Sequence, residues 1–169
     1  MTEPAPIVIL TTGGTIDKIY TLAGELEIGP PLVEEILEPV VTTVPIVVEP
    51  VLSKDSLELT GEDREALARA VARSGARRIV ITHGTDTMAL TAEHLLRDAP
   101  ADATIVLTGA LQPASMSRSD AAFNLGFAVA AAQTSPPGVY VAMGARILPA
   151  GGVVKDRRTG AFLPSPATD

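Results

Sequence analysis

The chain of 169 residues is 46% hydrophobic but only 3% aromatic, which suits one domain with a core of aliphatic side chains. Its formal net charge of −7 argues against a surface that neutralises nucleic-acid phosphates. The chain contains no cysteine, which excludes disulfides, thiolate nucleophiles and cysteine-bound zinc. Its two histidines are too few for a multi-histidine metal site, so neither a metal nor a nucleic-acid partner is expected.

The sequence gives no sign of a membrane or export segment. No apolar run reaches the ~18 residues that are needed to cross a bilayer. The first residues, Met-Thr-Glu-Pro, carry an acidic side chain where a secretory signal is basic. We therefore expect a cytoplasmic protein that does not bind membranes.

The first third of the chain predicts two strands, a long loop and a short helix. An apolar strand is expected at residues 7–12, followed by a loop at residues 13–31 that is long enough to be functional or disordered. Pro31 fits the first turn of a helix that continues to Leu37. Residues 44–52 predict a second strand, and its prolines favour an edge position in the sheet.

The middle of the chain predicts two helices with a buried strand between them. Residues 60–63, Thr-Gly-Glu-Asp, resemble a capping arrangement at the start of a helix that runs to about Ser74. A strand ends within residues 80–88, Val-Ile-Thr-His-Gly-Thr-Asp-Thr-Met, where apolar residues give way to hydroxyls, a glycine and a carboxylate. A helix over residues 89–96 follows, with Leu90, Leu95 and Leu96 expected on one face.

The last third predicts two more strands around a helix, and then a β-rich tail. The strands are expected at residues 103–108 and 139–143. The helix between them is capped by Ser119 or Asp120 and stops before Pro136-Pro137-Gly138. Residues 145–163 predict short β-like pieces.

Alternating strands and helices predict a single α/β domain with a doubly wound, mostly parallel sheet and a short β-like tail. In a flavodoxin-like strand order, 2-1-3-4-5, the first strand lies between the second and the third. The polar residues after these three strands, Thr15, Ser56 and Thr85-Asp86, then converge on one crevice at the carboxyl edge of the sheet.

The reactive groups in this crevice are hydroxyls, carboxylates and lysines, since no Gly-x-Ser-x-Gly elbow or phosphate-binding glycine loop is present. A threonine hydroxyl is a poor nucleophile until a base removes its proton, and a desolvated lysine can be that base. Thr85 beside Asp86 therefore requires a lysine partner. The spacing does not choose between Lys18, Lys54 and Lys155.

Two strand ends carry a pair of motifs, Thr12-Gly13-Gly14-Thr15-Ile16 and Thr82-His83-Gly84-Thr85-Asp86-Thr87-Met88. In this order, the pair resembles the signature motifs of the bacterial-type L-asparaginases, which are threonine-dependent amidohydrolases. The resemblance covers nearly the whole chain. The further matches are Asp55-Ser56 with Leu59-Thr60, Thr108-Gly109-Ala110 with Ser115-Met116-Ser117, and Gly151-Gly152 before Lys155.

The resemblance implies roles for five residues in catalysis without a cofactor. Thr15 would attack the side-chain amide of L-asparagine, release ammonia and form a β-aspartyl ester. The sequence does not decide whether Thr15 or Thr85 acts first, and Thr15 is favoured because it precedes a loop that could close over the substrate. Thr85, Lys155 and Asp86 would form a second group of hydroxyl, base and carboxylate. In the family a loop tyrosine assists the nucleophile, and Tyr20 is the only candidate for it here.

The resemblance also implies how the substrate is held. Ser56 would bind its α-carboxylate and Asp86 its α-ammonium group. Backbone N–H groups near Gly14 and Thr85 would stabilise the oxyanion. The expected substrate-binding residues are Asp55, Ser56, Gly84, Thr85 and Asp86.

Family members typically carry a second, smaller C-terminal domain, and this chain ends where that domain would begin. We therefore expect one catalytic domain, residues 1–169, and no second domain. The chain is then either a short form with a more open site or a fragment. Because members are usually oligomers, a homo-oligomer is expected.

The expected function is conversion of L-asparagine to L-aspartate and ammonia, with L-glutamine as a slower substrate. One rival is the ammonia-supplying amidase domain of a tRNA-dependent amidotransferase. Another is a non-catalytic domain that binds amino acids. His83 is expected to be a packed structural histidine, because a lysine-based reaction leaves it no proton to move.

Overall fold

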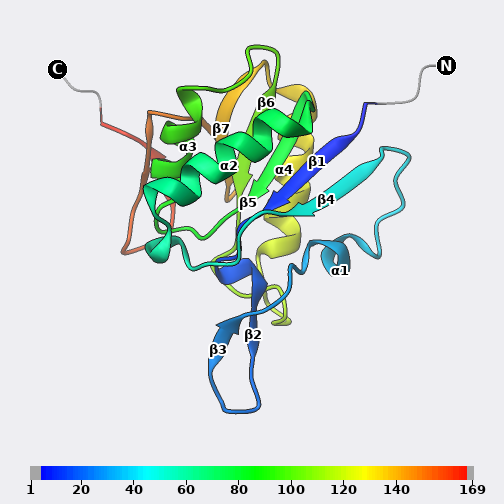
Figure 1. Ribbon diagram of the computed structural model, residues 1–169. Helices are drawn as coiled ribbons and strands as arrows, with labels where there is room; N and C mark the ends of the chain where they lie inside the picture. Colours follow the sequence, from blue (N-terminus) through cyan, green and yellow to red (C-terminus); the bar gives the residue numbers. More distant parts are fainter. Residues whose placement is uncertain (1–4, 167–169) are drawn as a thin grey trace.

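The sheet is assembled on β1 (Ile7–Thr11), which pairs in parallel with β4 on one side and β5 on the other. The computed structural model describes residues 5–166, and its main sheet has the order β4-β1-β5-β6-β7-β8 (Figure 1). The predicted order of the five parallel strands is confirmed, as is the edge position of β4. The other strands of this sheet are β4 (Ile46–Pro50), β5 (Arg78–Thr82), β6 (Thr104–Thr108), β7 (Gly138–Met143) and the antiparallel β8 (Arg146–Pro149).

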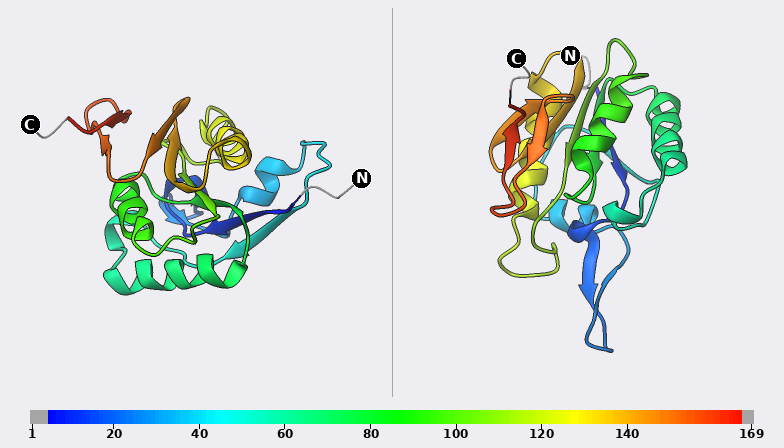
Figure 2. Two further views of the ribbon diagram at one scale, coloured as in Figure 1. Left: turned by 90° about the horizontal axis from the view of Figure 1, so that it is seen from above. Right: turned by 90° about the vertical axis from the view of Figure 1, so that its left-hand side faces the viewer.

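Helices cover both faces of the sheet, as the alternating pattern predicts. Helices α2 (Gly61–Ser74) and α3 (Met88–Leu96) pack on one face, and α4 (Ala121–Thr134) with the short α1 (Val33–Leu37) packs on the other (Figure 2). In β1, Val8 and Leu10 face the first pair of helices. Because both faces are covered, the central strands are continuous apolar runs.

The three leucines that were expected on one face of α3 do not share a face. Leu90 and Leu96 are 53% and 47% exposed, whereas Leu95 is buried. A helical repeat of 3.6 residues counted from the buried Met88 reaches Thr91, Ala92 and Leu95, and leaves the other two leucines outside. The cap of α2 agrees with prediction, because Thr60 and Asp63 form a capping box.

Residues 13–31 contain regular elements where the sequence predicted one long loop. They form a 3₁₀ turn η1 (Thr15–Asp17) and then a hairpin of β2 (Lys18–Tyr20) and β3 (Leu26–Ile28), which projects from the body of the molecule (Figure 1). The hairpin turns through Gly24, which has a positive φ of 85°. Helix α1 begins at Val33, later than predicted.

The start of α1 is held by Asp17, a buried carboxyl group that is 1% exposed. Its Oδ1 accepts the N–H of Leu32 at 3.0 Å. Burial raises the pKa of Asp17 to about 6, although the Leu32 N–H opposes this shift. The folded protein therefore favours the neutral carboxyl, and its stability falls as the pH rises through the window between 3.8 and about 6.

Asp17→Asn is expected to stabilise the protein at pH 7.5, because it removes a buried charge while an amide oxygen remains to accept the Leu32 N–H. The free energy of unfolding should rise by about 1–2 kcal/mol. Urea denaturation at pH 7.5 and at pH 4 measures it, and the gain should shrink towards zero at the lower pH. Equal stability of the two proteins at pH 7.5 would show that the carboxylate is not destabilising.

The chain ends in a second hairpin, β9 (Val153–Lys155) and β10 (Phe162–Pro164), where the sequence predicted β-like pieces. This hairpin packs against the α3 side of the sheet, with Val153 and Phe162 in the core. It thereby fixes Lys155 beside the loops at the carboxyl edge of the sheet. Within residues 5–166, no helix has the length and apolarity needed to cross a bilayer.

Candidate active site

The two motif loops touch through their glycines. Gly14 has φ 84° and ψ −171°, a conformation that only glycine adopts readily, and a Cβ here would overlap the backbone of Gly84. A Cβ on Gly84 would in turn lie 2.7 Å from the Cβ and Oγ of Ser56. Thr15 and Thr85 each follow directly on one of the touching glycines, so the convergence that the strand order predicts is present.

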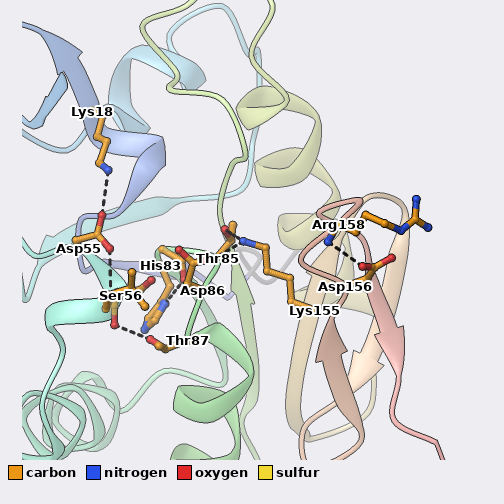
Figure 3. Close-up of polar contacts among 12 residues, drawn as sticks. Lys18, Asp55, Ser56, His83, Thr85, Asp86, Thr87, Lys155, Asp156 and Arg158 are labelled. Atoms are coloured by element: carbon orange, nitrogen blue, oxygen red, sulfur yellow. Dashed lines mark hydrogen bonds and ion pairs between the residues drawn. The ribbon is translucent and has the colours of Figure 1, made fainter. Parts of the chain in front are cut away.

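Lys155 contacts both polar residues of the second motif. Its Nζ donates to Thr85 Oγ1 and to Asp86 Oδ1, each at 2.7 Å (Figure 3). The side chain of Lys155 is 15% exposed and that of Asp86 is 40% exposed. The hydroxyl of Thr85 thus lies within proton-transfer distance of an amine that a carboxylate also holds.

The other two candidate lysines contact different carboxylates. Lys18 lies 3.0 Å from Asp55 Oδ2, and Lys54 lies 2.9 Å from Asp63 Oδ1. The structure thereby selects Lys155 from the three candidates as the partner of Thr85.

Asp55 and Ser56 lie at the start of a 3₁₀ turn, η2 (Ser56–Glu58), beside the loop contact. Partial burial raises the pKa of Asp55, but the Lys18 ammonium and the Leu57 N–H outweigh it and hold the pKa below its usual value. The carboxylate is therefore already engaged by a cation. Ser56 is 1% exposed and packs against Gly84.

Thr15 is the first residue of η1 and is partly buried. Its hydroxyl makes no hydrogen bond to any group in residues 5–166, so it remains available to a substrate. Of the two expected oxyanion donors, the N–H of Gly14 is not available, because it donates to Lys54 O at 3.0 Å. The N–H of Thr85 has no backbone acceptor in the described part of the chain, so it can serve as a donor.

Tyr20 is not brought to this cluster. It ends β2 on the projecting hairpin, is 69% exposed, and its hydroxyl lies towards Gly24 at the hairpin turn. Its hydroxyl makes no hydrogen bond to Thr15 or Thr85.

His83 is buried within the second motif and is 0% exposed. Its Nδ1 lies 2.7 Å from Gly84 O, so Nδ1 carries the proton. Burial, with a smaller contribution from nearby Arg64, lowers the pKa of His83 to about 4, although the hydrogen bond to Gly84 opposes this shift. The ring is therefore neutral at pH 7, in accord with a structural role.

Two polar residues near the site were not predicted to take part. The hydroxyl of Thr87 donates to Ser56 O at 2.7 Å (Figure 3), and Arg64 of α2 is buried against it at 3.3 Å. Within residues 5–166, no grouping of three or more His, Asp or Glu side chains is suited to hold a metal ion.

Comparison with known proteins gives one family. The family model described as asparaginase, N-terminal, matches residues 6–163. An L-asparaginase of Thermococcus kodakarensis is 40% identical over 103 residues, 58% of this chain and 31% of that protein. A protein named as a probable periplasmic L-asparaginase of Haemophilus influenzae is 35% identical over 166 residues, 90% of this chain and 47% of its own length.

The solved structure of the thermostable L-asparaginase from Thermococcus kodakarensis superposes with a TM-score of 0.83 at 32% identity, covering 94% of this chain and 51% of that one. A component of the glutamyl-tRNA(Gln) amidotransferase of Methanococcus vannielii is 47% identical over 70 residues, 41% of this chain and 16% of that protein. The chain thus spans about half the length of these relatives, or less.

Proposed function

The chain belongs to the asparaginase family, and on this premise we propose that it hydrolyses L-asparagine to L-aspartate and ammonia. The observation that carries the proposal is the contact of Lys155 with Thr85 and Asp86. This contact of Lys155 lies beside the place where Gly14 packs against the backbone of Gly84. A hydroxyl, an amine and a carboxylate there form the unit that activates an oxygen nucleophile.

The first proposed step forms a covalent ester. Thr15 Oγ1 attacks the side-chain amide carbon of asparagine, and its proton passes to the leaving nitrogen, so that ammonia departs. The N–H of Thr85 stabilises the oxyanion that develops on the amide oxygen. In the second step, a water molecule attacks the ester carbonyl, Thr15 regains its proton and aspartate is released.

Lys155 is the proposed base for the proton transfers in these two steps. In the first step Thr85 Oγ1 takes the proton of Thr15 as the Lys155 amine takes that of Thr85, and the same route in reverse delivers a proton to the leaving nitrogen. Asp86 stabilises the ammonium form of Lys155 between the two transfers. The low exposure of the Lys155 side chain, 15%, strengthens both interactions. Tyr20, on its exposed hairpin, has no step in this scheme.

Substrate binding is proposed at the charged ends of the amino acid. Ser56 takes the α-carboxylate and Asp86 the α-ammonium group, with the backbone of Gly84 between them. Asp55 contributes indirectly, because its carboxylate is already paired with Lys18. Glutamine is longer by one methylene, which is worth about 1–3 kcal/mol of discrimination, so it is the slower substrate.

One rival activity is supported by the similarity to an amidotransferase component. An amidase of that kind would also use Thr15 but would supply ammonia to a partner enzyme. A non-catalytic domain would bind an amino acid without turnover. A homo-oligomer and a cytoplasmic location stay predictions. A homo-oligomer would have a light-scattering mass above that of one 17.5 kDa chain.

Ammonia release from L-asparagine and, separately, from L-glutamine tests the proposal. The wild type should release it from both, faster from asparagine, and Thr15→Ala should release none while it still folds and binds L-aspartate. Turnover that survives in Thr15→Ala would remove Thr15 from its proposed role. Binding without turnover in the wild type would favour the non-catalytic alternative.

A further inference from the structure

Arg64 on α2 is a buried guanidinium without a carboxylate partner in residues 5–166. It is 8% exposed, and buried arginines are usually paired with acids. Its donors reach four neutral oxygens instead: Nε reaches Thr91 Oγ1 at 3.0 Å, Nη1 reaches Leu59 O at 3.0 Å and Thr60 O at 3.2 Å, and Nη2 reaches Thr87 Oγ1 at 3.3 Å.

These acceptors belong to separate segments that meet at the site. Leu59 and Thr60 end the segment that begins with Asp55 and Ser56, while Thr87 ends the loop that carries Thr85. The planar guanidinium presents its donors in a rigid fork. One side chain therefore fixes the end of the first segment against the end of the second.

Thr87 extends this connection to Ser56. Its hydroxyl accepts from Arg64 Nη2 and donates to Ser56 O at 2.7 Å. The hydroxyl is therefore engaged both as an acceptor and as a donor. The continuous path from Arg64 through Thr87 to Ser56 joins the two segments a second time, in addition to the contact of Ser56 with Gly84.

We propose that Arg64 is a positioning residue for substrate binding, which acts through Thr87 to hold Ser56 at a fixed place relative to Asp86. The inference rests on the proposed function, in which these two residues bind the α-carboxylate and α-ammonium groups. Those groups sit on one carbon atom, so their two partners must keep a fixed separation. Lys155 and Thr85 do not bond to Arg64, and its loss affects binding more than the chemical step.

Three variants test the inference, with Arg69→Met as the control because Arg69 is an exposed arginine of the same helix. Arg64→Met removes every donor, Arg64→Lys keeps the charge without the fork, and Thr87→Val removes the linking hydroxyl. Arg64→Met and Thr87→Val should each raise KM for L-asparagine about tenfold and change kcat less than about twofold. Arg64→Lys should fall between wild type and Arg64→Met.

The double variant Arg64→Met/Thr87→Val adds the decisive comparison. Both single changes break the same path, so the double variant should raise KM no further than the more affected single variant. A wild-type KM in Thr87→Val, or a loss confined to kcat, would overturn the inference. If Arg64→Met does not fold, Thr87→Val and Arg64→Lys decide the matter.

The dissociation constant of L-aspartate separates failure of this inference from failure of the proposed function. It should rise about tenfold in Thr87→Val and by a smaller factor in Arg64→Lys, whether or not turnover is measured. An active wild type whose variants keep their KM and their aspartate affinity refutes the positioning role alone. A wild type that neither turns over asparagine nor binds aspartate refutes the proposed function and this inference with it.

Discussion

Lys155→Met is expected to lower kcat/KM for L-asparagine about a thousandfold, as is typical when a general base is removed. The Nζ atom bonds both Thr85 Oγ1 and Asp86 Oδ1 at 2.7 Å, and the thioether of methionine can replace neither bond. Methionine keeps most of the volume of the lysine stem, so the β9–β10 hairpin should still pack. The rates are measured by ammonia release under steady-state conditions.

Arg157→Met is the matched control for Lys155→Met. Arg157 is an exposed cation two residues further along the same hairpin, and its loss changes the net charge equally. It should leave kcat/KM within about twofold, because exposed charges contribute little. Equal losses in the two variants would mean that the hairpin needs positive charge and not an amine at Thr85.

Gly14→Ala is expected to destabilise the protein by at least about 3 kcal/mol and to abolish activity. Its φ of 84° and ψ of −171° strain any residue with a side chain, and the new methyl group would overlap the backbone of Gly84. Gly84 cannot move away from this methyl group, since its other side packs on Ser56. Thermal unfolding with an activity assay measures both effects.

Gly61→Ala is the control for Gly14→Ala, and it is expected to raise the stability of the protein. Gly61 is the first residue of α2 and no atom lies within 4 Å of a Cβ built there. Alanine at this position should stabilise the protein by about 0.5–1 kcal/mol, because it lowers the conformational entropy of the unfolded chain. If Gly14→Ala were as stable as Gly61→Ala, the close contact between the two motif loops would be refuted.

The arrangement of the sheet could be predicted from the sequence because its strands are buried on both faces. Residues 7–10 and 79–81 are apolar throughout, and alternation with helices allows few parallel orders. The hairpin at residues 18–28 could not be predicted, since two strands of three residues give too short an alternation. The expectation that Leu90, Leu95 and Leu96 share one face of α3 was wrong because their spacing does not follow the helical repeat of 3.6 residues.

The site was predictable in its residue types but not in its contacts. Thr85 and Lys155 lie 70 positions apart, and their pairing depends on where the final hairpin packs. Arg64 was missed because its neighbours, Glu-Asp before it and Glu after it, are typical of a solvated helix face. Its spacing to Leu67 and Val71, three and seven residues on, was the signal that it faces inward.

The most direct test of the acyl-threonine reaction is to locate the ester. Wild-type protein is mixed with L-asparagine, quenched in acid, digested and analysed by mass spectrometry, with Thr15→Ala treated in parallel. An aspartyl adduct on the peptide that contains Thr15, absent from the variant, is the predicted result. Ammonia release with the adduct on Thr85, or with none on either threonine, would contradict it.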